Sequence, residues 1–502
     1  MNWKIIAKSM AQKEMRNRIL VVLGIILAFR VLAHIPVPLS NPETLHQVLN
    51  NLFNSENSPQ LLSFINVLSG GALAHFSIMI AGLGPYINAS IIMQLLTKAI
   101  PQLEALHKEG EFGQKKINQY TRMLTFPLAL IQSVGSIYLI KQAAQSIGGI
   151  GDITANTSLV QWGLMVAALT GGSMLLMWLG ELITEQGVGN GISLLITVGI
   201  VSSLPGQISQ IFGSIFGSKD RWVLFGHSLP INKSALIYGV GITLAVLVVT
   251  WIVVMLNEGA RKLTVNYAKR VQGNRAYGGI TTVLPVKLIT AGVVPIIFAV
   301  AFLSVPSFVG QILSSSQSAN LAQWGTHLST WFQNPSAQTF ATMGWQAYIY
   351  PVTYFLLVFV FTFFYTSITF NSTEIAENLH KQGGFIEGVR GGEQTEKYLS
   401  KIVNRLTFFG ALSLGLLAVL PIIAQIFIDD QNIAVGGTSV LILVSVALQT
   451  LRAVESRALM VTYDQYSQPD FFYDDETAAG PVTGRRLRFG SRIKSLGKNK
   501  NK

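Results

Sequence analysis

The stretch SFINVLSGGALAHFSIMIAGLGPYINASIIMQLL, residues 63–96, contains two apolar segments of different kinds. The first, residues 63–76, is too short to cross about 30 Å of hydrocarbon, which takes about 20 helical residues. Its centre, Ser69-Gly70-Gly71, is a poor helix former. The second segment belongs to an apolar run that can span a bilayer, residues 76–97. The first segment is therefore either re-entrant, held against protein at membrane depth, or an interfacial helix lying flat outside.

The whole chain has the composition of a polytopic membrane protein. Half of its 502 residues are apolar and 12% are charged, against about 25% charged in soluble domains. A scan with a window of about 19 residues predicts ten membrane-spanning helices. They are expected near residues 19–38, 76–97, 120–140, 159–180, 189–206, 235–256, 288–308, 346–369, 406–427 and 437–455. The sequence thus predicts an all-α polytopic membrane protein.

Basic residues between the spans predict the orientation, since loops rich in Lys and Arg stay in the cytosol. Such residues gather in one alternate set of segments, within 98–122, 257–287 and 371–405. The other set, 39–60, 309–345 and 428–436, contains no Lys or Arg. Both termini are therefore expected in the cytosol. One segment disagrees, because Lys219, Arg221 and Lys233 lie on the predicted outer side.

The spans divide the chain into two halves, residues 1–206 and 235–455. Each half has five predicted spans, and an odd number gives the halves opposite orientations, as in inverted-topology repeats. Residues 207–234, rich in glycine, are expected to form an external hinge loop. The tail, residues 456–502, is acidic and then strongly basic, and is expected to be mostly disordered.

Signatures of catalysis and of ion coupling are missing from the sequence. It has no cysteine, no GxxxxGK[ST] loop, no HExxH and no histidines at metal-ligand spacing. The run Gly187-Val-Gly189-Asn-Gly191 imitates part of a dinucleotide fingerprint but leads into a span, so we interpret it as a helix cap. Arg30 is almost alone as an ionisable residue within the spans, whereas ion-coupled transporters generally need such groups in mid-membrane. We expect no enzyme, no catalytic residue, no metal and no cofactor.

Long strings of sequence also resemble one known family, in the same order along the chain. They are GLGPYINASIIMQLL (82–96), KEGEFGQKKINQYTR (108–122), WLGELITEQGVGNGIS (178–193), VNYAKR (265–270), AGVVP (291–295), GEQTEKYL (392–399), RLTFFGAL (405–412) and GGTS (436–439). Through them the chain resembles the SecY/Sec61 family of protein-conducting channels, up to about residue 465. The resemblance implies two inverted five-helix halves around a central pore.

By similarity to this family, six bulky aliphatic residues match a pore ring: Leu83, Ile87, Ile192, Ile196, Ile297 and Ile442. Two pairs among them are four residues apart, so each pair shares one helix face. Such a ring can block ions by dewetting and still bond no passing side chain specifically. The family's plug, a short re-entrant helix, matches residues 63–74: Ser63, Phe64, Ile65, Asn66, Val67, Leu68, Ser69, Gly70, Gly71, Ala72, Leu73 and Ala74.

The resemblance also implies a lateral gate between the second, third, seventh and eighth spans. Polar residues on two of these spans are its candidate members: Asn88, Ser90, Gln94 and Gln132. The same residues also suit ordinary hydrogen bonding between membrane helices. At Ile289-Thr290 the chain departs from the family, because many relatives carry an asparagine there.

Two basic loops match the family's cytosolic docking loops for a ribosome or a SecA motor. Their candidate partner-binding residues are Arg261, Lys262, Lys269, Arg270, Arg275, Arg390 and Lys397. Positive-inside topology alone also explains basic residues in these loops. Gly391 follows Arg390 where relatives often have proline, which predicts a less rigid loop.

The resemblance implies the central channel subunit of a protein translocase. It would move unfolded secretory polypeptides across a bacterial plasma membrane and release membrane helices sideways into lipid. The implied partners are SecE, SecG, the SecA motor ATPase, the ribosome, signal sequences, nascent polypeptides and membrane lipids. Two alternatives stay open at this point: a secondary transporter built on inverted repeats, and a specialised accessory member of the family.

Overall fold

The computed structural model describes residues 13–37, 77–146, 158–215, 221–224, 227–267, 270–272, 275–277, 281–314, 318–333, 335, 339–340, 344–428 and 431–463. Residues Asn17–Val454 form one compact unit. The expected plug, residues 63–74, and the tail after residue 463 lie outside the described residues.

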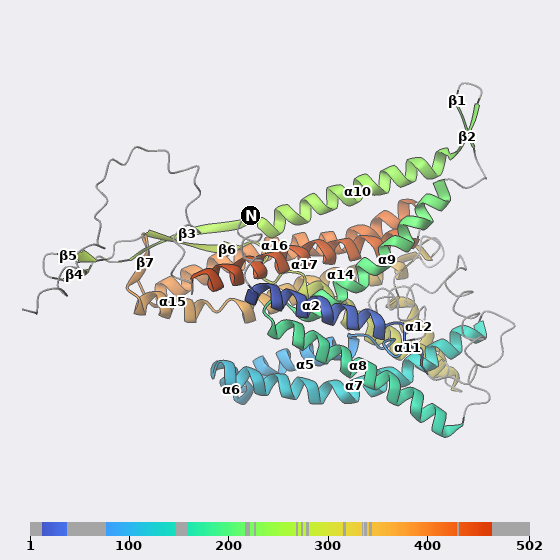
Figure 1. Cartoon of the computed structure of the whole chain (residues 1–502), viewed down its shortest axis with the longest axis horizontal. Helices are drawn as coiled ribbons and strands as arrows, with labels where there is room; N and C mark the ends of the chain where they lie inside the picture. Colours follow the sequence, from blue (N-terminus) through green and yellow to red (C-terminus); the bar gives the residue numbers. More distant parts are fainter. Residues whose placement is uncertain are drawn as a thin grey trace, which may run out of the picture. The chain divides into compact units, whose positions relative to one another are not determined.

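Ten long helices within the described residues coincide with the ten expected spans (Figure 1). They are α2 (Lys13–Leu32), α5 (Gly84–Ala99), α7 (Glu111–Ser146), α8 (Leu159–Glu185), α9 (Gly191–Ile215), α10 (Lys233–Glu258), α11 (Val294–Ser314), α14 (Ile349–Thr369), α16 (Glu393–Ile428) and α17 (Gln431–Tyr463). By length and apolarity, six of the described helical segments are able to cross a membrane. The chain is a multi-pass α-helical membrane protein, as the sequence predicts.

The second span begins later than its hydropathy suggests. Residues 78–83 form turns, and α5 starts at Gly84 with Pro85 in its first turn. Hydrogen bonds from Ser77 Oγ to Leu32 O (3.0 Å) and from Ser173 Oγ to Gly82 O (2.9 Å) hold these turns. Gly82 has φ of +60°, a left-handed conformation that glycine adopts readily. Hydropathy alone therefore predicts a start for this helix that is several residues too early.

The expected hinge, residues 207–234, contains regular structure. Helix α9 continues past Pro205 to Ile215. Strands β1 (Arg221–Leu224) and β2 (His227–Asn232) then pair antiparallel, and α10 follows directly. The hydroxyls of Ser202 and Ser203 bond to carbonyls three residues earlier, in the turn before the proline. Neighbouring Ser side chains of this kind help a helix to tolerate a proline.

The uncharged segment between the seventh and eighth spans also contains helices that the sequence analysis did not predict. They are α12 (Ala319–Trp331) and the short 3-10 helix η1 (Gly344–Tyr348). Helix α12 packs closely on α11, because Gly310 and Gly325 let the two backbones approach. A side chain at Gly325 would meet the backbone of residues Leu313 and Ser314.

A three-stranded antiparallel sheet in the order β6-β3-β7 joins the two basic loops. Strand β3 (Ala260–Tyr267) pairs with β6 (Thr281–Lys287) and with β7 (Gly384–Ile386). The shorter strands β4 (Arg270–Gln272) and β5 (Arg275–Tyr277) pair with each other. Helices α6 (Pro101–Lys108) and α15 (Ser372–Lys381) complete the described elements. From the sequence, this region is expected to contain only loops.

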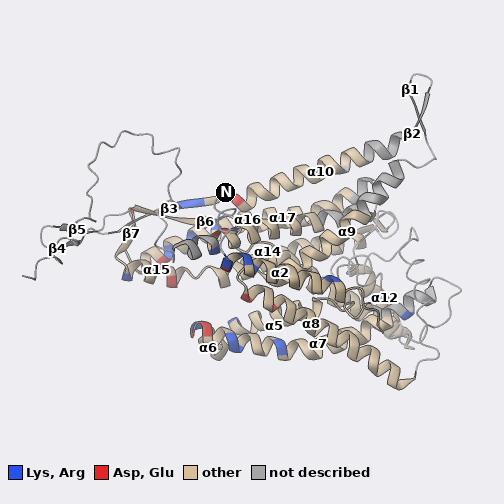
Figure 2. Cartoon of the chain, in the orientation of Figure 1, with Lys and Arg blue, Asp and Glu red and all other residues tan. Residues whose placement is uncertain are grey.

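The long helices and the sheet pack around two separate apolar cores. The larger lies among the long helices, and the smaller packs β3, β6 and β7 against α15 and α16. Many large apolar residues on the outer helix faces are exposed, such as Leu244, Leu247 and Trp251 on α10, as expected of a lipid-facing surface. Charged residues gather at the end of the helices where α6, α15 and β3 lie (Figure 2).

Candidate functional site

The start of α5 places the first two predicted ring residues. Leu83 is the N-cap of α5, and Ile87 N donates to Leu83 O at 3.0 Å. Both side chains are buried. Since Pro85 has no N–H, the first turn of a helix suits it. The turn before Gly84 therefore directs Leu83 and Ile87 into the larger core on one face.

The turn between α8 and α9 places the next two. Gly187 and Gly189 have positive φ angles of 74° and 111°. Asn190 Oδ1 accepts hydrogen bonds from Ile192 N (3.1 Å) and Ser193 N (3.2 Å). This N-cap confirms the interpretation of the glycine run as a helix cap. It starts α9 so that Ile192 and Ile196 face the same core as Ile87.

Helices α11 and α17 supply the last two, Ile297 and Ile442. Ile297 lies in the first turn of α11, just after Gly292, whose φ is +63°. Ile442 lies in α17, and both isoleucines are buried in the larger core. The structure therefore brings all six residues into one apolar cluster, five of them buried and Ile192 partly buried.

A small cavity of about 70 Å³ lies within this cluster. Ile87, Ile192, Ile196 and Ile297 line it, whereas Leu83 and Ile442 pack nearby. Since one water occupies about 30 Å³ in the liquid, the cavity holds at most a few waters. Polar side chains such as Ser90, Gln94, Asn190 and Ser193 also line it. The four isoleucines form its aliphatic part, and an aliphatic constriction tends to dewet and block ions.

Two of the four predicted gate residues line the same cavity. Gln94 Nε2 donates to Ser90 Oγ at 3.2 Å. Gln94 Oε1 is buried and, within the described part of the chain, has no hydrogen-bond partner. A buried acceptor without a partner costs about 1–3 kcal/mol. The cavity in this structure thus contains one polar group in an unfavourable state.

The other two predicted gate residues lie outside the cavity. The side-chain amide of Gln132 packs against Gly84. A Cβ atom at Gly84 would lie 3.0 Å from Gln132 Nε2. Asn88 is partly buried on α5. The structure therefore groups Ser90 and Gln94 with the ring, and places Gln132 at the contact between α5 and α7.

The four helices of the predicted gate touch one another in this structure. Helix α11 contacts α5, α7 and α14. The ring of Phe308 on α11 fills the space beside Gly135 on α7, so the helices meet without a gap. Ile289, at the departure from the family, is buried in the larger core. This end of α11 therefore contributes an apolar contact.

Three aromatic residues of the cavity, Tyr86, Phe298 and Tyr365, were not expected from the sequence. Two of them, Phe298 and Tyr365, contact each other. Their rings meet edge to face with centroids 6.1 Å apart, which joins α11 to α14 beside the ring residues. Phe298 follows Ile297 directly, but an apolar span contains many such aromatics. The sequence held no signal that distinguishes these two.

The predicted partner-binding residues lie at the charged end. Arg261 and Lys262 on β3 and Arg390 before α16 are exposed, and Lys397 pairs with Glu393 at 2.7 Å. The strand register sets Arg270 opposite Tyr277 and Arg275 opposite Gln272. Lys269 lies outside the described residues. The pairing of β3 with β7 brings Arg261 and Arg390, far apart in sequence, into one module.

The backbone after Arg390 is tied to α16 despite Gly391. Thr395 Oγ1 donates to Arg390 O at 3.0 Å, and Val389 N donates to Ile386 O at 3.0 Å. Gly391 also lies against the ring of His380. These hydrogen bonds and contacts restrain the backbone of the turn, even though glycine follows Arg390.

A polar bracket, which the sequence did not predict, joins α17 to the end of α10 next to β3. Arg452 on α17 pairs with Glu258 at 2.5 Å and donates to Asn257 O at 3.3 Å. Asn257 Nδ2 donates to Ser445 Oγ at 2.9 Å. Partial burial lowers the pKa of Lys287 at the end of β6, Arg452 lowers it further, and Glu258 opposes them.

Comparisons with known proteins agree with this architecture. The family model SecY matches residues 77–451. The chain is 38% identical to the protein translocase subunit SecY of Streptomyces galbus over 467 residues, which cover 92% of this chain and 98% of that relative. It is 40% identical to the subunit of the same name from Corynebacterium glutamicum over 463 residues, 91% of this chain and 98% of the relative.

Two solved structures share the fold. One, described as a protein conducting channel, has a TM-score of 0.57 at 18% identity and covers 89% of this chain and 93% of the other. A second, of the SecY protein and its plug domain, has a TM-score of 0.55 at 17% identity with the same coverage. Because the family model spans most of the chain and both relatives align over nearly their whole length, this chain belongs to the SecY family.

Proposed function

We propose that this chain is the channel-forming subunit of a protein translocase, which moves unfolded polypeptides across a membrane. One observation carries the proposal: aliphatic side chains from α5, α9, α11 and α17 meet in one apolar cluster, and those from α5, α9 and α11 line a small cavity. Such a wall seals against ions when closed. The aliphatic side chains offer no hydrogen bond that would hold a passing chain at one place, so they suit a substrate of variable sequence.

The channel opens sideways between α5 and α7 on one side and α11 and α14 on the other. Ser90 and Gln94 border this contact, and the bond between them is one weak polar link that opening can replace with water. Gln94 Oε1 would gain a partner on hydration. Membrane-protein helices would leave through this gate into lipid. Residues 63–74 serve as the plug on the outer side of the constriction.

The sheet module, β6-β3-β7 with α15 and the start of α16, is the docking surface for cytosolic partners. Its exposed cations, Arg261, Lys262 and Arg390, suit ribosomal RNA phosphates or an acidic motor surface. The partners are then the ribosome, a SecA motor, and the small subunits SecE and SecG. Energy comes from the motor, the elongating ribosome or the membrane potential, since the chain has no nucleotide-binding loop.

The location we propose is a bacterial plasma membrane, with both termini in the cytosol. The charged end of the helices would then face the cytosol, in accord with the positive-inside rule (Figure 2). The halves 1–206 and 235–455 would act as two inverted units that separate at the gate. In this arrangement the bracket around Arg452, which joins α10 to α17, lies at the cytosolic end.

Crosslinking to a trapped substrate tests the function directly. The cysteine-free chain accepts single cysteines at Ile87 and Ile297 in the wall and at Leu247 on the outer face of α10. With a secretory polypeptide arrested during transport in vesicles, Ile87→Cys and Ile297→Cys should crosslink to it and Leu247→Cys should not. Equal crosslinking at all three positions, or none at the wall in vesicles that transport, would refute the proposed path. A transporter of small solutes would give no such crosslink.

A further inference from the structure

The turns of residues 77–83 carry the backbone into the constriction. They lie between α2 and the start of α5, and all of their residues except Ile78 are buried. Non-helical backbone is tolerated at membrane depth only where protein or a water-filled cavity surrounds it. The conformation of these turns therefore depends on the helices that pack against them.

Helix α8 holds the turns from one side. Ser173 Oγ donates to Gly82 O at 2.9 Å, and the Ser173 side chain is fully buried. One residue earlier, Gly172 lets the two backbones meet, because a Cβ atom at Gly172 would overlap Ile78 O. A larger side chain at this position cannot be accommodated unless the helix or the turns move.

Helix α2 and the residues after it hold the turns from another side. Ser77 Oγ donates to Leu32 O (3.0 Å) and accepts from Met79 N (3.2 Å). Ile78 N donates to Ile35 O at 3.0 Å. The turns are thus fixed between two supports, of which α8 contacts the part nearer to the ring.

The peptide held by α8 leads directly into the ring. Gly82 O belongs to the peptide unit that Leu83 N completes, and Ile87 N in turn donates to Leu83 O. A displacement of this peptide unit would move Leu83 first, and then the first turn of α5 with Ile87. Within the described residues, neither Gly172 nor Ser173 lines the cavity between the ring residues.

We propose that Ser173 and Gly172 are positioning residues of the barrier, which hold the turns against α8 and so keep Leu83 and Ile87 in the constriction. The inference rests on the proposed channel function. It makes α8, which supplies no member of the ring, one of the elements that determine how tightly the channel closes. Without the Ser173 hydroxyl, Gly82 O would lose this partner in a buried place, which favours any arrangement in which the turns leave α8.

Planar-bilayer conductance of the full chain in potassium chloride, without a substrate, tests the role of the hydroxyl. Ser173→Ala should raise the conductance about five-fold, the shift of an equilibrium that one buried hydrogen bond of average strength accounts for. Thr170→Val is the matched control. It removes a buried hydrogen bond of the same helix, from Thr170 Oγ1 to Ser133 Oγ at 3.2 Å, which does not involve the turns. Thr170→Val should lower the melting temperature about as much as Ser173→Ala and leave the conductance low.

A second pair of variants tests the close approach of the backbones. Gly172→Ala should raise the conductance more than Ser173→Ala does, because the added methyl group pushes α8 and the turns apart. Gly171→Ala is the control, since a Cβ atom at Gly171 meets no atom within 4 Å. If Gly172→Ala does not insert into the membrane, the comparison of Ser173→Ala with Thr170→Val still decides.

Ile87→Asn, in the ring itself, separates this inference from the proposed function. A leak in Ile87→Asn with unchanged conductance in Ser173→Ala would overturn the role of α8 and leave the channel intact. An equal leak in Ser173→Ala and Thr170→Val would overturn it as well, because the hydroxyl would then contribute to stability alone. Unchanged conductance in all of these variants, Ile87→Asn included, would refute the barrier, and the proposed function and the inference with it.

Discussion

The constriction and the sheet module use different forces. Around the constriction, side chains from four helices make apolar contacts, which have no preferred direction. Small helix movements therefore change the width of the opening gradually. In the sheet module, backbone hydrogen bonds set the register, and a core of its own supports it. The constriction can therefore yield to a substrate while the module keeps its shape for a partner. Each prediction below separates the two regions further, from the largest expected change in stability to the smallest.

The largest effect is expected in the small core. Val265 lies buried on the central strand β3. Val265→Asp would bury a charge without a partner, at a cost of about 3–5 kcal/mol. We expect the module to unfold locally, with rapid hydrogen exchange over residues 260–287 and 384–386. Thr264→Asp, at an exposed position on the same strand, is the control and should leave exchange nearly unchanged. If both variants also lost the long helices, the two cores would not be independent.

Next comes the constriction itself. Ile87→Asn should cost about 1–3 kcal/mol in the closed state, because a buried amide lacks partners there. That energy corresponds to roughly a 5- to 150-fold shift toward the open state. Planar-bilayer conductance should rise accordingly, and export of a polypeptide with a defective signal sequence should improve. Ile87→Leu is the control, and its planar-bilayer conductance should stay low. Unchanged conductance in Ile87→Asn would remove this residue from the barrier.

A smaller effect of opposite sign is expected at Gln94. Gln94→Leu removes the unpartnered buried acceptor, and should stabilise the closed form by about 1 kcal/mol. The melting temperature should rise while insertion of membrane-protein helices slows. The exposed Gln102 on α6 provides the comparison, since Gln102→Leu should change neither. A fall in melting temperature for Gln94→Leu would mean that its oxygen has a partner that stabilises the closed form.

The smallest change in stability is expected for the exposed cations. Arg261→Glu with Arg390→Glu should alter the free energy of unfolding by less than about 0.5 kcal/mol. Partner binding and transport should nevertheless weaken. Added salt should reduce the difference from the unmodified chain, because exposed charges are screened over about 8–10 Å. Lys115→Glu on α7, away from the sheet, is the control. Loss of channel abundance in parallel with transport would instead assign these arginines to folding.

Hydropathy and local capping signals in the sequence are enough to predict the ten long helices. Ten spans follow from hydropathy, because a chain in lipid must satisfy its backbone hydrogen bonds within each helix. The cap at Asn190 also follows from a local run of glycines. The residues of the ring, by contrast, came from resemblance to a family, since any one isoleucine in a span looks like ordinary packing.

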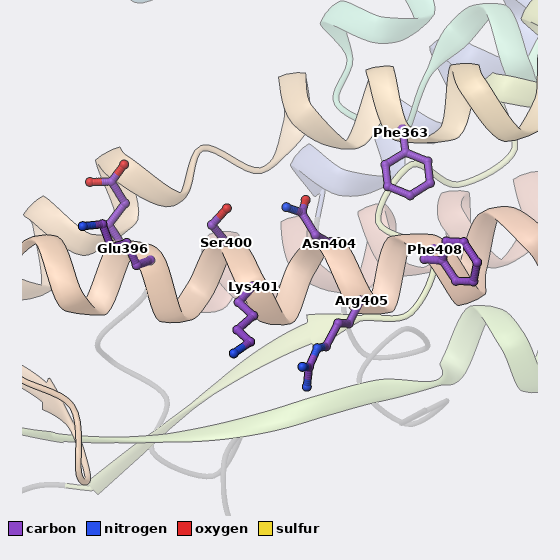
Figure 3. Close-up of a pocket in the computed structure, with 8 residues that line it drawn as sticks. Phe363, Glu396, Ser400, Lys401, Asn404, Arg405 and Phe408 are labelled. Atoms are coloured by element: carbon purple, nitrogen blue, oxygen red, sulfur yellow. The ribbon is translucent and has the colours of Figure 1, made fainter.

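Which distant segments meet depends on the tertiary structure. The alternation of Leu263 and Val265 in β3 was a strand signal, but nothing local indicates that β3 pairs with β7 more than 100 residues later. The same holds for α12, whose position depends on the close approach of Gly310 and Gly325, and for the hollow of about 710 Å³ beside Lys401 and Arg405, which exists because α14 packs beside α16 (Figure 3). A cap acts within one turn of a helix and hydropathy within one span of about 20 residues, whereas strand pairing and close packing depend on residues far apart in sequence.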